Sequence, residues 1–266
     1  MRIERTAVGA LVALLVIFLG LPVAVLIVRA VAGGALAAAL GDPVVLEALW
    51  LSVATTAISL LLTVVLGAPL AYVLARRRFR GSSLVETIVD LPIVLPPSVA
   101  GLALLLVFGR RGLVGPSLDV IGLSIPFTTL AVVMAQVFVA APFFVRATRA
   151  GLADVDRDLE DAARVDGATD WHVLRWISLP LASSAVSAGI VLCWARALGE
   201  FGATIMFAGS IAAITRTLPL FVYGEFQAGD LNASIAAAAI LVVAAFLVLL
   251  SVRVLRLPRA IDLRVG

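Results

Sequence analysis

Two residues of opposite charge lie inside an apolar stretch of the chain, where charged side chains are rare. Arg196 and Glu200 are four residues apart among Ala, Leu, Phe and Gly. In a helix this spacing places both on one face, so they can form an ion pair. A charge at membrane depth costs about 2.5–3.5 kcal/mol on insertion scales. The two side chains are therefore either a structural pair or residues that border a water-filled path or gate.

Small and hydroxyl residues accompany this pair. Gly199 and Gly202 permit close helix approach or local unwinding around a small anion. Thr204 and Ser98 are the hydroxyl groups we expect to contact such an anion in a translocation path, since a path that must release its ion needs weak donors. Either hydroxyl could instead be an ordinary packing residue.

Two adjacent prolines, Pro96 and Pro97, come directly before Ser98. They remove two backbone donors and forbid a regular α-helix across that point. We expect either a bent or re-entrant helix start that lines the path or gate, or a helix that simply begins at Pro97.

A polar segment (residues 150–180) interrupts the apolar sequence. It is rich in acidic residues, among them Glu160 and Asp161, and contains Gly167 and Pro180 as helix breakers. We expect short helices and turns outside the membrane. Such a segment must contact something other than lipid.

The elements that position these residues are apolar helices. The 266 residues are 62% hydrophobic and only 14% charged, which excludes a soluble protein with one core. Runs long enough to span a bilayer, about 20 residues each, occur at roughly 7–29, 49–75, 91–109, 127–148, 181–208 and 234–255. We expect an all-α, polytopic membrane protein with about six helices in one domain, residues 1–266. The first run is too long for a cleaved signal peptide, although Ala30-Val31-Ala32 leaves cleavage open.

The basic residues predict how the chain is oriented. All 20 are Arg, in short clusters between apolar runs, which indicates membrane topology and no nucleic-acid binding. With the amino terminus inside, fifteen lie in the cytoplasm and four outside, namely Arg29, Arg110, Arg111 and Arg216, while the twentieth, Arg196, lies within the fifth apolar run. This arrangement predicts a multi-pass plasma-membrane protein whose termini and polar segment are cytoplasmic.

The polar segment resembles the coupling loop of ABC importer permeases. The motif residues are Asp161, Ala162, Ala163, Gly167, Ile177, Leu179 and Pro180. Asp161 stands where the family usually has Glu, and Glu160 adjoins it. The resemblance implies that a helix of this segment docks on a separate ATPase subunit. The alternative is a solvated amphipathic loop with no partner.

Residues 90–101, 197–209 and 215–220 are similar to molybdate permeases of ABC importers, with Ser210 where we expect Asn. The resemblance implies a type I importer permease fold, a homodimer of the permease, ABC ATPase subunits and an extracytoplasmic oxyanion-binding protein. Molybdate is the expected cargo, and tungstate or sulfate are the alternatives. The chain has no Lys, hence no phosphate-binding loop, so it is not the ATPase. We expect no cofactor, metal site or catalytic group.

Two other classes of membrane protein share the composition. An ion-coupled secondary transporter would use carboxylates near mid-membrane, where only Glu200 qualifies, and would give the polar segment no role. A membrane scaffold would explain neither the spacing of the polar segment nor the Arg196 and Glu200 pair.

Overall fold

The structure of this protein is a computed structural model that describes residues 2–77 and 79–262. Arg78 and Arg264, which the topology prediction counted, lie outside these residues. The described part of the chain is helical and contains no strand. Its elements are α1 (Arg2–Ala32), α2 (Ala35–Leu40), α3 (Pro43–Arg76), α4 (Ser82–Val94), α5 (Pro97–Phe108), α6 (Gly115–Val120), α7 (Thr129–Ala153), α8 (Arg157–Val165), α9 (Asp170–Val173), the π-helical turn η1 (Leu174–Ser178), α10 (Leu179–Leu181), α11 (Ser183–Leu198), α12 (Gly202–Phe207), α13 (Leu218–Ala228) and α14 (Leu231–Asp262).

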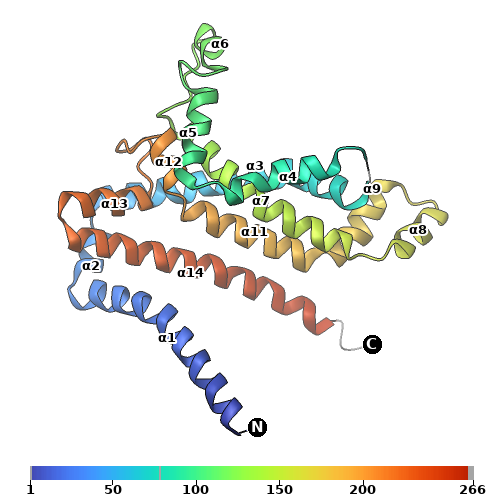
Figure 1. Ribbon diagram of the computed structural model, residues 1–266, viewed down its shortest axis with the longest axis horizontal. Coiled ribbons are helices and arrows are strands. Elements are labelled where there is room, and N and C mark those ends of the chain that lie inside the picture. Colours follow the sequence, from blue (N-terminus) through green and yellow to red (C-terminus); the bar gives the residue numbers. More distant parts are fainter. Residues whose placement is uncertain (1, 78, 263–266) are drawn as a thin grey trace.

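Helices α3, α7 and α11 pack together as the centre of an elongated bundle, and α14 runs along it (Figure 1). The short helices of the polar segment lie at one end of this bundle, whereas α12 and α13 lie at the other. Helices α5 and α6 project away from the bundle, and α1 diverges from α14 toward its own amino terminus. The two charged regions singled out in the sequence are therefore far apart.

Small residues allow the central helices to approach closely. Phe144 of α7 is fully buried between α3 and α11. A Cβ atom on Gly67 of α3 would lie 3.1 Å from Cδ1 of Phe144, and one on Gly189 of α11 would lie 3.1 Å from its carbonyl oxygen. Helices in lipid associate largely through such close packing, because lipid chains are as apolar as the helices themselves.

A row of buried hydroxyl side chains on α3 adds polar contacts to this packing. Its members are Ser52, Thr55, Thr56, Ser59 and Thr63. Thr55 accepts a hydrogen bond from Nε2 of Gln136 on α7, at 3.1 Å. Thr56 accepts one from Nε1 of Trp194 on α11, also at 3.1 Å. These bonds connect α3 to both neighbours in a region where unsatisfied polar groups are costly.

The number of membrane spans agrees with the sequence. Within the described residues, α1, α3, α7 and α14 are long and apolar enough to cross a membrane. Two bent pairs add to these: α4 with α5, at 118°, and residues 170–181 with α11, at 74°. If each bent pair is one span, the total is six, as predicted.

Two predicted spans differ in detail from the structure. The stretch 91–109 is not one helix, because α4 ends at Val94 and α5 begins at Pro97, so both the expected bend and the expected start occur. The stretch 181–208 is also interrupted: α11 ends at Leu198, and α12 begins after a helix break (residues 199–201). The local unwinding that the glycines of this stretch permit is therefore present, and the next section describes the contacts at the break.

Candidate functional site

The helix break is organised by Glu200. Nη2 of Arg196 lies 2.7 Å from Oε2 of Glu200, so the ion pair expected from their spacing is present. The side chain of Glu200 is 1% exposed, whereas that of Arg196 is 26% exposed. Arg196 thus neutralises a buried carboxylate while its own side chain stays partly exposed.

The other oxygen of Glu200 starts the next helix. Oε1 accepts a hydrogen bond from the backbone N–H of Ala203 at 2.7 Å. A carboxylate in this place satisfies one of the donors that a helix leaves free at its first turn. Gly199 ends α11 on the other side of the break, where its N–H bonds to the carbonyl oxygen of Ala195. The carboxylate of Glu200 therefore contacts both helices at the break: it pairs with Arg196 of α11 and accepts a hydrogen bond from Ala203 in the first turn of α12.

The break contacts the start of α5 directly. A Cβ atom on Gly202 would lie 2.8 Å from Cβ of Pro97 and 3.2 Å from the backbone nitrogen of Ser98. One turn further along α5, a Cβ atom on Gly101 would lie 2.5 Å from the carbonyl oxygen of Ala203. Neither position has room for a side chain. The structure thus brings the proline pair and the glycines of the fifth stretch together, which sequence spacing alone did not predict.

The two hydroxyl candidates differ in their surroundings. Ser98 is exposed, as are Pro96 and Pro97, at the amino end of α5. Thr204 is fully buried on α12, and its Oγ1 has no hydrogen-bond partner. Of these two residues, only Ser98 lies on the surface of the chain.

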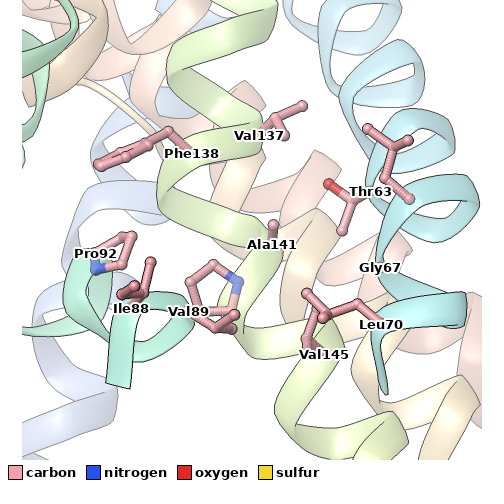
Figure 2. Close-up of a pocket in the computed structure, with 12 residues that line it drawn as sticks. Thr63, Gly67, Leu70, Ile88, Val89, Pro92, Val137, Phe138, Ala141 and Val145 are labelled. Carbon is pink, nitrogen blue, oxygen red and sulfur yellow. The ribbon is translucent and has the colours of Figure 1, made fainter. Parts of the chain in front are cut away.

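A separate pocket of about 260 Å³ lies between α3, α4 and α7 (Figure 2). Its walls are apolar, with Phe138, Val145 and Ile88 among them, and Thr63 is the polar side chain that lines it. It contains no charged group and none of the residues at the helix break. Such a pocket is unsuited to an oxyanion, which needs several hydrogen-bond donors.

The polar segment folds into short helices, as expected. Asp156 caps α8 by accepting the N–H of Asp158 at 3.0 Å, and Thr169 caps α9 by accepting the N–H of His172 at 3.3 Å. Gly167 joins the two helices with φ of +89°, a conformation that glycine adopts without steric cost. The remaining motif residues lie on the outside: Asp161, Ala162 and Pro180 are exposed, and Ala163, Ile177 and Leu179 are half-buried.

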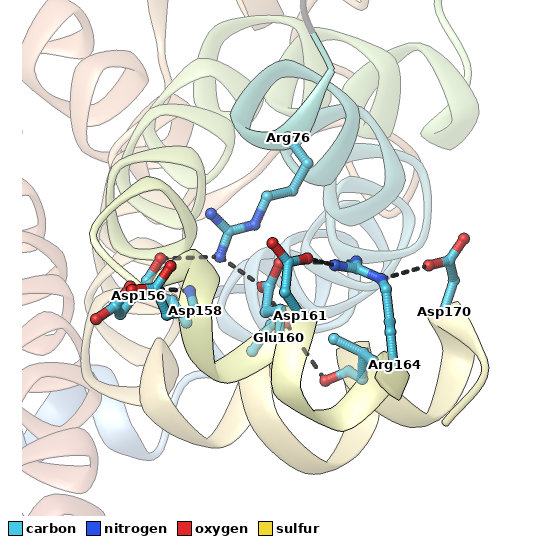
Figure 3. A network of polar contacts seen from close by, with 10 residues as sticks. Arg76, Asp156, Asp158, Glu160, Asp161, Arg164 and Asp170 are labelled. Atoms are coloured by element: carbon cyan, nitrogen blue, oxygen red, sulfur yellow. Dashed lines mark hydrogen bonds and ion pairs between the residues drawn. The ribbon is translucent and has the colours of Figure 1, made fainter. Parts of the chain in front are cut away.

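Glu160 points inward, unlike its neighbour Asp161. Its Oε1 lies 2.6 Å from Nη2 of Arg76 at the end of α3, and it accepts a hydrogen bond from Oγ of Ser178 at 2.6 Å. Figure 3 shows the Arg76 side chain reaching down from α3 to this carboxylate. The acidic residue that the motif aligns is Asp161, but the buried one is Glu160.

A second network lies on the surface of the same segment. Arg164 contacts Oδ1 of Asp161 at 2.7 Å and Oδ1 of Asp170 at 3.2 Å (Figure 3). The hydrogen bond to Asp170, with a further contribution from Asp161, raises the pKa of Arg164. This network joins the end of α8 to the start of α9 across Gly167.

Large apolar side chains are exposed beside these charges. Val165, Trp171 and Trp176 are 87%, 61% and 68% exposed. All three belong to the polar segment. Exposed apolar surface of this kind is typical of sites that contact another protein or a membrane.

One family of known proteins matches a part of the chain that contains both the helix break and the polar segment. The family of binding-protein-dependent transport system inner membrane components matches residues 67–264. The chain belongs to this family. The matched part includes both the helix break and the polar segment, whereas α1, α2 and most of α3 precede it. Membership together with the apolar helices makes the chain a multi-pass membrane transport protein.

Individual relatives show which kinds of transport protein the chain is similar to. The chain is 46% identical to the molybdenum transport system permease protein ModB of Mycobacterium tuberculosis over 217 residues, 82% of this chain and 81% of that protein. It is 39% identical to the sulfate transport system permease protein CysW of Synechococcus elongatus over 191 residues, 71% of this chain and 67% of that protein. A bacterial ABC transporter that imports the acidic polysaccharide alginate superposes with a TM-score of 0.74 at 19% identity, over 95% of this chain and 94% of that chain. The permease fold of this family, expected from the resemblance, is confirmed.

Two residues of the polar segment's network were not found from the sequence. Arg76 entered the sequence analysis only through the topology count, and Ser178 was an unassigned position between two motif residues. Contacts between residues so far apart in the chain leave no local spacing to detect. The available signal was indirect: a carboxylate that becomes buried needs a cation or several donors.

Proposed function

We propose that this chain is the membrane-spanning permease subunit of an ATP-driven importer that brings molybdate into the cytoplasm. The 46% identity to a molybdenum transport permease, over most of both chains, carries this proposal. Residues 1–266 form one permease domain. Two copies pair in the membrane, and two separate ATPase subunits and an extracytoplasmic oxyanion-binding protein complete the importer. Both termini and the polar segment face the cytoplasm.

The exposed apolar side chains of the polar segment support docking on an ATPase. Trp171, Trp176 and Val165 present an apolar surface at the end of the bundle that the Arg count assigns to the cytoplasm. An ATPase must supply the energy, because a dianion entering a cell at about −100 mV inside meets about 4.6 kcal/mol of adverse potential. ATP binding and hydrolysis then favour inward-facing and outward-facing states in turn.

The contact between α5 and α12 supports a gate at the helix break. Gly202 packs against Pro97 and Ser98 without space for a side chain, so the two elements close tightly here. Glu200 binds the first turn of α12 and pairs with Arg196, so the short helix is held to α11. The gate opens when α5 and α12 separate, and Ser98 then faces the passing ion.

The partial exposure of Arg196 supports an anionic cargo. Its charge is balanced by Glu200, yet its side chain is 26% exposed, so we propose that it can donate a hydrogen bond to an oxyanion. A balanced pair attracts a dianion less strongly than a free Arg would. Weak attraction is what a transport path requires, since the ion must leave as readily as it enters.

Sulfate is a second candidate cargo. The 39% identity to a sulfate permease favours it, because sulfate is also a tetrahedral dianion. The identity is lower and covers less of both chains than that to the molybdenum permease, so we place molybdate first and keep tungstate beside it.

Uptake by the reconstituted complex tests the proposal. Proteoliposomes would contain this chain, its ATPase and its binding protein, and molybdate entry would be measured with and without ATP. We expect ATP-dependent uptake that excess molybdate or tungstate inhibits and excess sulfate does not. Inhibition by sulfate alone would make this a sulfate permease. Uptake without ATP that follows an ion gradient would instead make it a secondary transporter.

A further inference from the structure

The carboxyl-terminal end of α3 is joined to the polar segment by a buried charge cluster. Nη2 of Arg76 donates to Oε1 of Glu160 at 2.6 Å and to the carbonyl oxygen of Val155 at 3.2 Å. Ser178 donates to the same Oε1 at 2.6 Å. The side chains of Arg76 and Glu160 are 8% and 3% exposed, and Ser178 is fully buried.

Each member of this cluster lies at a different part of the polar segment. Val155 is where the chain leaves α7, Glu160 is on α8, and Ser178 closes the π-helical turn that leads toward α11. A π-helical turn inside a helical region is rare and marks functional positions. Arg76 therefore binds the start of the polar segment at Val155 and, through Glu160, its end at Ser178.

This arrangement differs from what stability alone would favour. Replacing a buried ion pair by apolar residues of similar volume is often neutral or stabilising, because both charges must be desolvated. Here Nε of Arg76 is also buried without a hydrogen-bond partner. What the cluster does provide is a fixed geometry between two elements that are separated in the chain.

We infer that Arg76 is a positioning residue that transmits movement of the polar segment to α3. The inference depends on the proposed function, since it assumes that an ATPase moves this segment. Helix α3 spans Pro43–Arg76 and bonds to α7 through Thr55 and to α11 through Thr56. A rigid helix with bonded neighbours carries a displacement from one end of the bundle toward the helix break.

The test measures the ratio of molybdate taken up to ATP hydrolysed in proteoliposomes that contain the complete complex. In Arg76→Gln we expect ATP hydrolysis to persist while the ratio falls by about tenfold, the size of an ordinary coupling free energy. The adjacent Arg77→Gln is the matched control, because Arg77 is exposed and lies outside the cluster. It should retain the wild-type ratio.

A double-mutant cycle shows whether the contact itself matters. Glu160→Ala, which removes the acceptor of both bonds, should lower the ratio as Arg76→Gln does, and the double variant should lower it no further, because both changes remove the same link. Additive losses would overturn the inference. If the charge variants do not fold, Ser178→Ala removes one bond of the cluster without removing a charge, and should give a smaller fall in the same ratio.

The outcomes separate this inference from the proposed function. Absence of ATP-dependent molybdate uptake by the wild-type complex would reject the proposed function. An unchanged ratio in Arg76→Gln, with wild-type uptake intact, would reject only the role of Arg76. A parallel fall of ATP hydrolysis and uptake would also reject it, since that result indicates a cluster needed only for folding or assembly.

Discussion

Two buried glutamates each have an Arg within 2.7 Å, but they act over different distances along the chain. Glu200 pairs with Arg196 four residues away and bonds to Ala203 three residues away, so it organises one short stretch of chain. Glu160 pairs with Arg76, which is 84 residues away, and so connects two separate elements. The same chemistry serves a local break in one place and a long-range link in the other. The comparison teaches that the sequence separation of a buried pair indicates whether it shapes an element or couples elements.

Removing Glu200 should have the largest effect. Glu200→Ala leaves Arg196 without its partner and α12 without its first-turn acceptor. Breaking a fully buried pair costs about 3–5 kcal/mol, which is an upper bound here because Arg196 is 26% exposed. We expect loss of molybdate uptake and a lower melting temperature of the purified complex. Glu200→Gln can still accept the N–H of Ala203 and should be the milder variant. Equal effects of the two changes would show that the helix-capping bond contributes little.

Adding a methyl group at Gly202 should have an intermediate effect. Gly202→Ala places a Cβ atom 2.8 Å from Cβ of Pro97, so α5 and α12 must move apart. Overpacking of this kind costs about 1–3 kcal/mol. We expect uptake to fall while the complex still assembles. Gly224→Ala is the matched control, because a Cβ atom there has open space. Unchanged uptake in Gly202→Ala would argue against a tight gate at this contact.

The smallest effect should come from the exposed network beside Glu160. Arg164→Gln removes contacts to Asp161 and Asp170 and a longer one, 3.8 Å, to Glu160. Because Arg164 and both aspartates are exposed, we expect these ion pairs to contribute only about 0–1 kcal/mol. We expect a small loss of thermal stability that disappears at high salt, because salt screens exposed charges. A loss as large as that of Arg76→Gln would mean that burial is not what distinguishes the two networks.

The stability from Arg164 should not depend on pH near neutrality. Its contacts with Asp170 and Asp161 raise the pKa of Arg164 in the folded protein. Arg164 therefore contributes to the stability of the fold, and this contribution is fully present at any pH below the pKa of Arg164 in the unfolded chain. That contribution would be lost only as pH rises through the raised value, far above neutral pH. Melting temperatures of wild type and Arg164→Gln should therefore differ by the same amount at pH 7 and pH 8.

Local features of the fold could be predicted from the sequence. The number of spans, the bend at Pro96 and Pro97 and the pairing of Arg196 with Glu200 all follow from rules that act within a few residues. The glycines of the fifth stretch indicate that a break is possible, but they do not give its position. The position depends on a hydrogen bond between the side chain of Glu200 and the backbone of Ala203.

Long-range features could not be predicted. The contact of Gly202 with Pro97 and the pairing of Glu160 with Arg76 depend on how distant elements pack. The sequence does not show which of the neighbouring acidic residues in the polar segment is buried. The motif aligns Asp161, whereas the structure buries Glu160. Similarly, Thr204 and Ser98 are both small hydroxyl residues, and only packing separates the buried one from the exposed one.

The most direct test compares Glu160→Gln with Glu200→Gln in the same reconstituted complex, with molybdate uptake and ATP hydrolysis measured together. We predict that Glu160→Gln hydrolyses ATP with little uptake, because the neutral side chain no longer forms the buried ion pair with Arg76 of α3. Glu200→Gln should slow molybdate uptake and ATP hydrolysis to the same degree. Because the contact between Arg76 and Glu160 is intact in this variant, slower opening of the gate also slows the ATPase. If both variants changed the ratio of uptake to hydrolysis alike, the assignment of coupling to Glu160 and gating to Glu200 would be contradicted.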